Sequence, residues 1–179
     1  MDSFNRLVEA YQGYIYNLTL RMLGRRDAAD DATQEAFISA YRNMGKFRGG
    51  NFKIWLYRIA SNVCHDQWRK AKKEASISLD ELVLNSERSL TNGRESPEEY
   101  ALRRELGREI QKGLETLPQD QRMAVVLSDV QGLSYEETAQ VLHCPVGTVR
   151  SRLSRGRANL RDFLLKKREL LPGNLRHYK

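Results

Sequence analysis

Apolar residues recur every three or four positions along most of this chain, which is the spacing of amphipathic α-helices and not of β-strands. The pattern predicts helices at about 4–24, 27–44, 52–73 and 97–117, followed by another at 119–130. The core-facing stripe of the first helix contains Phe4, Leu7, Val8, Tyr11, Ile15, Leu18 and Met22. We therefore expect an all-α protein.

Two further helices are predicted near the C-terminus, separated by a tight turn. Ser134 and Glu137 have the spacing of a capping box, in which a hydroxyl and a carboxylate satisfy free amides at the start of a helix. That helix should end at residues 143–144, a turn should occupy 145–148, and a second helix should begin at Val149. Helix, turn and helix in this order are typical of a helix-turn-helix motif.

The last predicted helix has two faces of opposite character. Its apolar face carries Val149, Leu153, Leu160 and Leu164, with Gly156 in the same stripe. On the opposite face, small residues lie between long cations: Ser151 and Ala158 are flanked by Arg150, Ser154 and Arg155. A helix in the major groove needs small residues for close approach and arginines for hydrogen bonds to guanine or phosphate. A solvated basic helix in an antiparallel pair would have a similar pattern.

The predicted helix at 27–44 has an unusual outer face. Two acids, an amide, an isoleucine and an arginine fall within a narrow arc, namely Asp31, Gln34, Glu35, Ile38 and Arg42. A solvated surface with an ion pair between Glu35 and Arg42 would explain most of this arc. The outward isoleucine favours a docking surface instead.

The predicted helix at 52–73 combines an apolar stripe with groups that suit nucleic acid. The stripe contains Phe52, Leu56, Ile59 and Val63. Around the rest of the helix lie Trp55, Tyr57, Arg58, Asn62, Asp66, Trp68, Arg69, Lys70, Lys72 and Lys73. Rings that stack on bases and cations that pair with phosphates suit single-stranded or partly opened DNA. The alternative is that the two tryptophans pack in the core.

Charge is distributed in three blocks. The net charge of +7 divides into +5 for residues 1–75, −3 for 76–116 and +5 for 117–179. Two basic modules joined by an acidic connector indicate two separate contacts with one polyanion. Residues 76–96 lose the helical period and gather Ser, Asn and Gly, so we predict a flexible linker there.

The remaining chemistry is sparse. Cys64 and Cys144 each neighbour a histidine, but they lie on different predicted modules, so we expect free cysteines, no metal and no other cofactor. No phosphate-binding loop or catalytic constellation is recognisable, so neither an enzyme nor a small-molecule substrate is expected. Because no signal peptide and no apolar run of roughly 18 residues occur, we expect a cytoplasmic protein that does not insert into the membrane.

Five segments in order resemble the extracytoplasmic-function (ECF) sigma factors of the sigma-70 family. They are DATQEAF at 31–37, WLYRIASN at 55–62, LPQDQR at 117–122, GLSYEE at 132–137 and PVGTVRSR at 145–152. The likeness covers about residues 3–168. It implies a bacterial transcription initiation factor with two small helical domains: sigma-2 at 1–75 and sigma-4 at 97–170, with a linker at 76–96 and a basic tail at 171–179.

The resemblance also implies roles for individual residues. Binding to core RNA polymerase, through the clamp coiled coil of the beta-prime subunit, falls on Asp31, Gln34, Glu35, Ile38 and Arg42. Capture of a flipped base of the minus-10 element falls on Phe47, Arg48 and Asn51 with Asn62, and further minus-10 contacts fall on Asp66 and Arg69. Reading of the minus-35 element falls on Thr148, Arg150, Ser151, Ser154 and Arg155.

The implied partners are core polymerase, with its beta flap as a second contact, promoter DNA and an anti-sigma factor. One departure from the family concerns residues 47–52, which are one residue shorter than the commonest pattern, so the minus-10 base preference stays open. A stand-alone helix-turn-helix regulator is the alternative function. Such a regulator would explain residues 117–168, but it predicts a dimerisation surface or ligand pocket in the N-terminal half.

Overall fold

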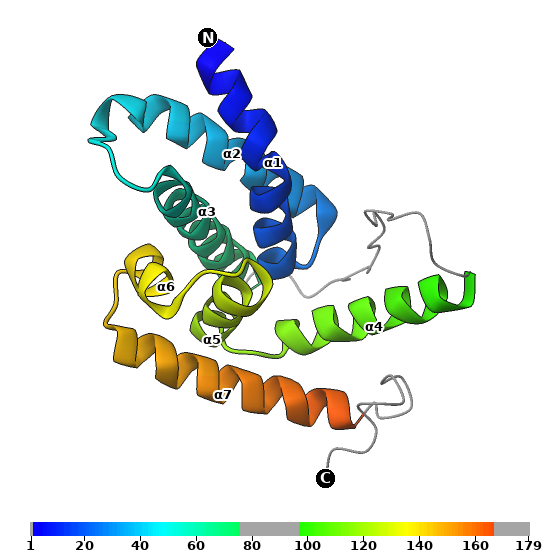
Figure 1. The fold of residues 1–179 in the computed structure, drawn as a ribbon. Helices are drawn as coiled ribbons and strands as arrows, with labels where there is room; N and C mark the ends of the chain where they lie inside the picture. The colour runs from blue at the N-terminus through cyan, green and yellow to red at the C-terminus, as the bar shows by residue number, and fades with distance from the viewer. Residues whose placement is uncertain (1, 76–96, 167–179) are drawn as a thin grey trace.

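The computed structural model of the chain describes residues 2–75 and 97–166, and these ranges are helical with short connections (Figure 1). The α-helices are α1 (Asp2–Leu23), α2 (Arg26–Asn43), α3 (Phe52–Ala75), α4 (Pro97–Glu115), α5 (Gln119–Val125), α6 (Tyr135–Leu142) and α7 (Val146–Leu165). A 3-10 turn, η1 (Met44–Lys46), follows α2, and a π-helical turn, η2 (Val126–Val130), follows α5. The predicted fold class is confirmed. The predicted linker at 76–96 and the tail at 171–179 lie outside the described residues.

The N-terminal module is a bundle of α1, α2 and α3. From α1, the large side chains of Ile15, Leu18 and Met22 are fully buried, whereas the buried positions of α2 are mostly alanines. Small residues on one helix let the backbones approach closely, and a hydroxyl then bridges them. Thr19 Oγ1 lies 3.2 Å from the carbonyl oxygen of Ala29 and 2.9 Å from Thr33 Oγ1. The bundle holds α3 in place and leaves part of its surface free of contact with α1 and α2.

The C-terminal module places α7 across α5, α6 and α4. Val149, Leu153 and Gly156 of the predicted apolar stripe are buried, while Leu160 and Leu164 are half-buried. A Cβ at position 156 would lie 2.8 Å from Val125 Cγ2, so the missing side chain permits the close approach of α7 to α5. The predicted stripe therefore does anchor this helix.

One boundary prediction was wrong: α7 begins at Val146 and not at Val149. Pro145 is the N-cap, and its carbonyl oxygen accepts hydrogen bonds from the amides of Thr148 (2.9 Å) and Val149 (3.2 Å). The first amides of a helix need no intrahelical partner, so a glycine and a threonine are accommodated in this turn. Residues 146–148, expected in the turn, are therefore the first turn of the helix.

The two modules pack against each other in the described structure, and one apolar core continues through both. α6 lies on α3, and α1 contacts α4, α5 and η2 (Figure 1). Arg122 of α5 is a central link: its Nη1 donates to the carbonyl oxygen of Met22 (2.7 Å) and its Nη2 to that of Glu115 (2.6 Å). The sequence pattern had indicated two modules joined by a linker and gave no sign of this contact.

No helix in the described ranges is both long enough and apolar enough to span a membrane.

Candidate nucleic-acid interface

The turn before α7 is held by specific local chemistry. Ser134 Oγ accepts a hydrogen bond from the amide of Glu137 (3.1 Å), and the Glu137 carboxylate accepts one from the amide of Ser134 (2.8 Å). The predicted capping box is thus confirmed. At the other end of α6, His143 adopts a left-handed conformation with φ of 48°, which reverses the chain toward Pro145. These two ends fix the angle at which α7 follows α6.

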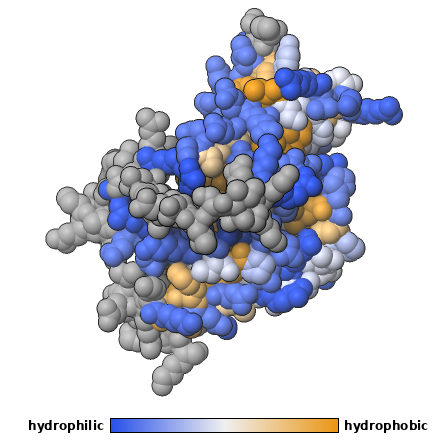
Figure 2. Space-filling view, turned by 180° about the vertical axis from the view of Figure 1, so that it is seen from behind, coloured by the Kyte–Doolittle hydropathy of each residue, from blue (hydrophilic) through white to orange (hydrophobic). Residues whose placement is uncertain are grey.

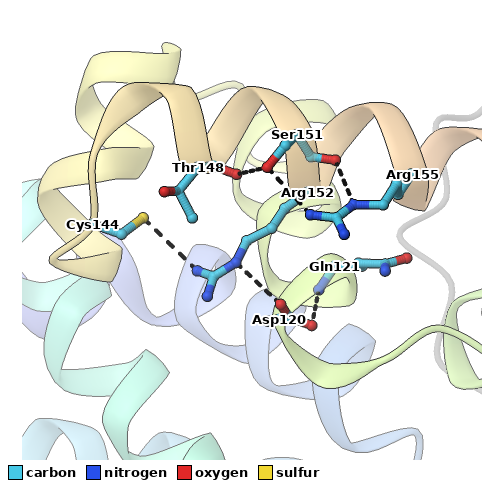
Figure 3. A network of polar contacts seen from close by, with 7 residues as sticks. All are labelled: Asp120, Gln121, Cys144, Thr148, Ser151, Arg152 and Arg155. Atoms are coloured by element: carbon cyan, nitrogen blue, oxygen red, sulfur yellow. Dashed lines mark hydrogen bonds and ion pairs between the residues drawn. The ribbon is translucent and has the colours of Figure 1, made fainter.

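The outward face of α7 carries the predicted DNA-reading residues. Arg150, Ser151, Ser154 and Arg155 are all exposed, and Thr148 is half-buried. Figure 3 shows Arg155 folded back along its own helix, where its Nε donates to the carbonyl oxygen of Ser151 (3.2 Å). Arg150 forms no hydrogen bond or ion pair with the residues that the structure describes. This face therefore presents two arginines that are available to an external ligand.

Two other arginines of α7 form ion pairs with acids of the same module and so position the helix. Arg152 Nε lies 3.1 Å from the carboxylate of Asp120 in α5 (Figure 3). Arg157 forms a bidentate ion pair with Asp129, in which its Nε and Nη2 lie 2.9 and 2.6 Å from the two carboxylate oxygens. It also donates a hydrogen bond to the hydroxyl of Tyr135 (3.2 Å). These hydrogen bonds raise the pKa of Arg157. Sequence reasoning missed Asp120, Asp129 and Tyr135, because partners separated by 22 to 32 positions leave no periodic signal.

The loop between η1 and α3 is open on one side and packed on the other. Arg48 and Asn51 are exposed, and Gly49 and Gly50 adopt positive φ angles of 92° and 97°, a region that favours glycine. Asn51 Oδ1 accepts a hydrogen bond from the amide of Ile54 (3.3 Å), so this side chain caps α3. The loop thus presents exposed polar groups next to the start of α3.

Phe47 fixes this loop through an aromatic cluster. Its ring centroid lies 5.7 Å from that of Phe52 and 5.1 Å from that of Trp55. All three side chains are half-buried. Ring edges and faces therefore remain accessible beside the exposed Asn51.

The exposed side of α3 carries Asn62, Asp66 and Arg69. Asp66 and Arg69 form an ion pair with each other across one helical turn. Asn62 has no side-chain hydrogen bond within the described part of the chain. Among the predicted minus-10 residues, Asn62 therefore has a side-chain amide without a hydrogen-bond partner in the described part of the chain. It lies on α3, which begins directly after the loop that contains Phe47.

The prediction that Tyr57 lies on the outer, DNA-facing side of α3 was wrong. Tyr57 is fully buried, and its hydroxyl donates to Gln131 Oε1 (2.8 Å) of the C-terminal module. Arg58 Nη2 donates to the carbonyl oxygen of Gln140 in α6 (2.8 Å), and the Trp68 ring lies 5.5 Å from the guanidinium of Arg122. α3 has a second packed face because the second module covers it, which a single-helix pattern could not reveal.

The outer arc of α2 borders a groove. Asp31, Gln34, Ile38 and Arg42 line a surface groove of about 590 Å³ between α1 and α2, together with apolar side chains that include Phe4, Val8 and Tyr41. Ile38 and Tyr41 are 45% and 54% exposed. Figure 2 shows apolar residues among hydrophilic ones near the free end of α1, at the top of the view. The expected alternative, an ion pair between Glu35 and Arg42, is not formed, although the structure describes both residues.

The cysteines lie apart in the structure. Cys64 is buried, and burial raises the pKa of its thiol to about 12. Cys144 is half-buried, and its sulfur lies 3.8 Å from Arg152 Nη1 (Figure 3). Among the described residues, no three side chains of His, Cys, Asp or Glu come together in a group that could hold a metal ion.

Comparison with known proteins identifies matches to both modules. The family model for Sigma-70 region 2 matches residues 7–74, and that for Sigma-70 region 4 matches residues 107–160. The chain is 38% identical over 166 residues to the ECF RNA polymerase sigma factor SigE of Mycolicibacterium smegmatis, covering 93% of this chain but 63% of that protein. It is 41% identical over 160 residues to the ECF RNA polymerase sigma-E factor of Escherichia coli, covering 87% of this chain and 83% of that protein.

Solved structures show the same fold. The sigma factor RpoE of Bartonella quintana, crystallised with the anti-sigma factor NepR, matches with a TM-score of 0.75 and 25% identity, over 92% of this chain and 98% of that one. CnrH, solved with the cytosolic domain of CnrY, matches with a TM-score of 0.65 and 27% identity, over 91% and 88% of the two chains.

Proposed function

The chain belongs to the ECF RNA polymerase sigma factors of the sigma-70 family, and from this premise we propose how its residues divide the work of promoter recognition. In this proposal the outer arc of α2 binds core RNA polymerase, the Phe47 loop and α3 capture the opened minus-10 strand, and α7 reads the minus-35 element. The polymerase supplies the chemistry, and this chain supplies position and sequence choice.

The proposal rests on one observation, namely that the arginines of α7 fall into two groups on different faces of the helix. Arg152 and Arg157 are held by acids of the same module, whereas Arg150 and Arg155 reach solvent beside the small side chain of Ser151. A helix that is fixed on one face and cationic on the other enters the major groove with little reorganisation. Thr148 and Ser154, at the start and on the outer face of α7, complete the proposed minus-35 surface.

The minus-10 role rests on the exposed amides of the N-terminal module. Asn51 and Asn62 are exposed, and an amide can both donate to and accept from a base edge. Phe47 and Trp55 provide ring surface in the same cluster, on which an unpaired base can stack. Arg48 and Arg69 are exposed cations that suit the phosphates of the same strand, and Asp66 orients Arg69.

Polymerase docking rests on the groove between α1 and α2. The carboxylates of Asp31 and Glu35 are exposed around the apolar side chain of Ile38. A docking site needs such an apolar centre with charged groups at its rim. Gln34 and Arg42 lie on the wall of the groove and add hydrogen-bonding capacity. We assign this surface to the clamp coiled coil of the beta-prime subunit and the C-terminal module to the beta flap.

The setting follows from the partners. A factor that acts on RNA polymerase and promoter DNA works in the bacterial cytoplasm. One solved relative, RpoE of Bartonella quintana, is bound to the anti-sigma factor NepR, so we propose that an anti-sigma factor also controls this chain.

Run-off transcription with purified core polymerase on genomic fragments tests the function directly. We expect discrete transcripts that require this chain, and their start sites return the promoter sequence. Absence of any transcript together with tight binding of the purified chain alone to duplex DNA would instead indicate a stand-alone regulator.

A further inference from the structure

Ser151 and Arg155 form a small hydrogen-bonded unit on the outward face of α7 (Figure 3). Arg155 Nε donates to the carbonyl oxygen of Ser151 (3.2 Å), and its Nη2 donates to Ser151 Oγ (3.3 Å). The Ser151 hydroxyl in turn donates to the carbonyl oxygen of Thr148 (2.9 Å). The hydroxyl therefore connects the guanidinium of Arg155 to the backbone of the first turn of α7.

The geometry of an α-helix explains this unit. Side chains of a helix lean toward its N-terminus, so a long side chain covers the residue one turn before it. Serine at position 151 leaves room for the side chain of Arg155 and supplies an oxygen that accepts a hydrogen bond. Both residues are exposed, and no carboxylate among the described residues pairs with Arg155. A neutral partner thus orients the cation, whose charge remains available to an external ligand.

The hydrogen-bonding capacity of the two side chains differs. The Ser151 hydroxyl gives its only proton to the Thr148 carbonyl oxygen and accepts from Arg155, so it has no proton left to donate to a base. Arg155 uses its Nε and one N–H group of Nη2, and the remaining N–H groups of Nη1 and Nη2 stay free. These free groups lie side by side at the end of the guanidinium, where they can donate to a pair of acceptors.

Arg150 is the contrasting arginine of the same face. Among the described residues it has no hydrogen-bond or ion-pair partner, so nothing holds its side chain in one rotamer. Ordering such a side chain on DNA costs conformational entropy. The two exposed arginines therefore differ in how far they are oriented before DNA binds.

We propose that Ser151 is a positioning residue, which orients Arg155 so that Nη1 and Nη2 donate to O6 and N7 of a guanine in the minus-35 element. In this assignment Ser151 acts through Arg155 and makes no base contact of its own. The guanine contact rests on the minus-35 role proposed above for α7, whereas the orientation of Arg155 in the free chain does not.

Substitutions at two serines separate positioning from direct reading. Ser151→Ala removes the hydroxyl without adding bulk, and alanine is the better helix former, so α7 should not be weakened. Ser151→Thr restores a hydroxyl that can bond to the same carbonyl oxygen. Ser154→Ala is the matched comparison, because Ser154 is exposed on the same face and its side chain forms no hydrogen bond with the described residues.

NMR relaxation of the arginine Nε groups in the free full chain measures the orientation itself. In the wild type we expect Arg155 to be more ordered than Arg150. Ser151→Ala should make Arg155 as mobile as Arg150, Ser151→Thr should restore its order, and Ser154→Ala should leave it unchanged. Equal mobility of the two arginines in the wild type would overturn the proposal, as would an Arg155 that stays ordered in Ser151→Ala.

Binding of the holoenzyme to duplex fragments with single-base changes in the minus-35 element gives the second readout. Ser151→Ala should weaken binding about three- to tenfold, which is the effect of one hydrogen bond. The loss should occur only on fragments that retain the guanine read by Arg155. It should disappear in an Arg155→Ala background, because residues that act as one unit are not additive. Any loss from Ser154→Ala should add to that from Arg155→Ala.

The binding outcomes are decisive in either direction. A loss from Ser151→Ala that persists in full in the Arg155→Ala background would make Ser151 a direct contact and overturn the proposal. Wild-type binding of Ser151→Ala to every fragment, or an Arg155-dependent preference for a base other than guanine, would also contradict it. If the wild-type holoenzyme shows no minus-35 preference at all, the proposed function and the guanine contact fail together. The relaxation measurement then still decides whether Ser151 orients Arg155.

Discussion

The two helices proposed to read DNA differ in how the rest of the molecule surrounds them. α7 has one face bound to its own module, through Asp120 and Asp129, and an opposite face whose arginines and serines are exposed. α3 is bound on two faces, by the N-terminal bundle and by the C-terminal module, and it exposes the narrower strip that carries Asn62. The duplex reader is thus complete within its module, whereas the strand reader shares its surface with the other module.

This difference fits the state of the DNA that each helix is proposed to meet. Duplex DNA is present before the polymerase arrives, so a rigid preformed helix can read it. An unpaired strand exists only after the promoter DNA has opened. The strand-binding surface of α3 can therefore be partly covered in the free protein without any loss of function.

The largest effect should come from the docking surface on which both readers depend. Replacing Asp31 and Glu35 together by lysine should abolish co-elution with core polymerase, because like charges across a docking face oppose association strongly. Both carboxylates are exposed, so circular dichroism should show an intact fold. Reversing Glu9 and Glu105, which are also exposed, makes the same change in net charge elsewhere. Co-elution of the first variant at wild-type level would remove the docking assignment.

The next prediction concerns the rigidity of the duplex reader. Gly156→Ala should lower the free energy of unfolding by about 1 to 3 kcal/mol, because the new methyl group overpacks against α5. The control is Gly147→Ala, where a Cβ meets nothing within 4 Å, and it should stabilise by about 0.4 to 1 kcal/mol. Urea denaturation measures both. Equal stabilities for the two variants would show that α7 is not fixed by this close approach.

Specificity of the duplex reader should depend on Arg155. Arg155→Ala should weaken minus-35 binding by the holoenzyme by about 1 to 3 kcal/mol if the side chain reads a base. The loss should vanish on a promoter already altered at the contacted base. A uniform loss across minus-35 variants, with a reduced salt dependence, would make Arg155 a phosphate contact instead.

The smallest effect is a pH dependence at the covered face of α3. Burial lowers the pKa of His65, and the nearby Arg69 and Arg152 lower it further, against the opposite effect of Asp66 and Asp120. In the unfolded chain the imidazole of His65 titrates near pH ~6.5. Around and below that pH the unfolded chain therefore binds more protons at this site than the folded chain does. The free energy of unfolding should therefore fall as the pH drops from 7 to 5.5. His65→Gln should flatten this slope in denaturant titrations, and an unchanged slope would contradict the assignment.

Much of the fold could be predicted from the sequence because helices leave a local signal. The capping box at Ser134 and the stripe through Val149 and Leu153 involve neighbours within one or two turns, so the periodicity contains them. The start of α7 was misplaced by three residues, because a proline cap followed by glycine and threonine has the composition of a turn.

The contact between modules could not be predicted in the same way. Tyr57 and Gln131 are 74 positions apart, and neither shows its partner in the local pattern. Tyr57 has the amphipathic chemistry of a base-stacking residue, and only the three-dimensional structure shows it in a protein interior. The roles of Phe47, Asn51 and Asn62 came from family resemblance, and their geometry now supports a proposal that mutation must test.

The measurement that most directly tests the division of labour compares Asn62→Ala with Arg155→Ala in the same holoenzyme. Permanganate footprinting reports opening of the minus-10 region, and gel-shift on a duplex fragment containing only the minus-35 element reports reading by α7. We predict that Asn62→Ala impairs opening of the minus-10 region and leaves minus-35 binding at wild-type level. Arg155→Ala should weaken minus-35 binding more than it impairs opening. Normal permanganate reactivity with Asn62→Ala, or equal loss of both signals in both variants, would contradict the account.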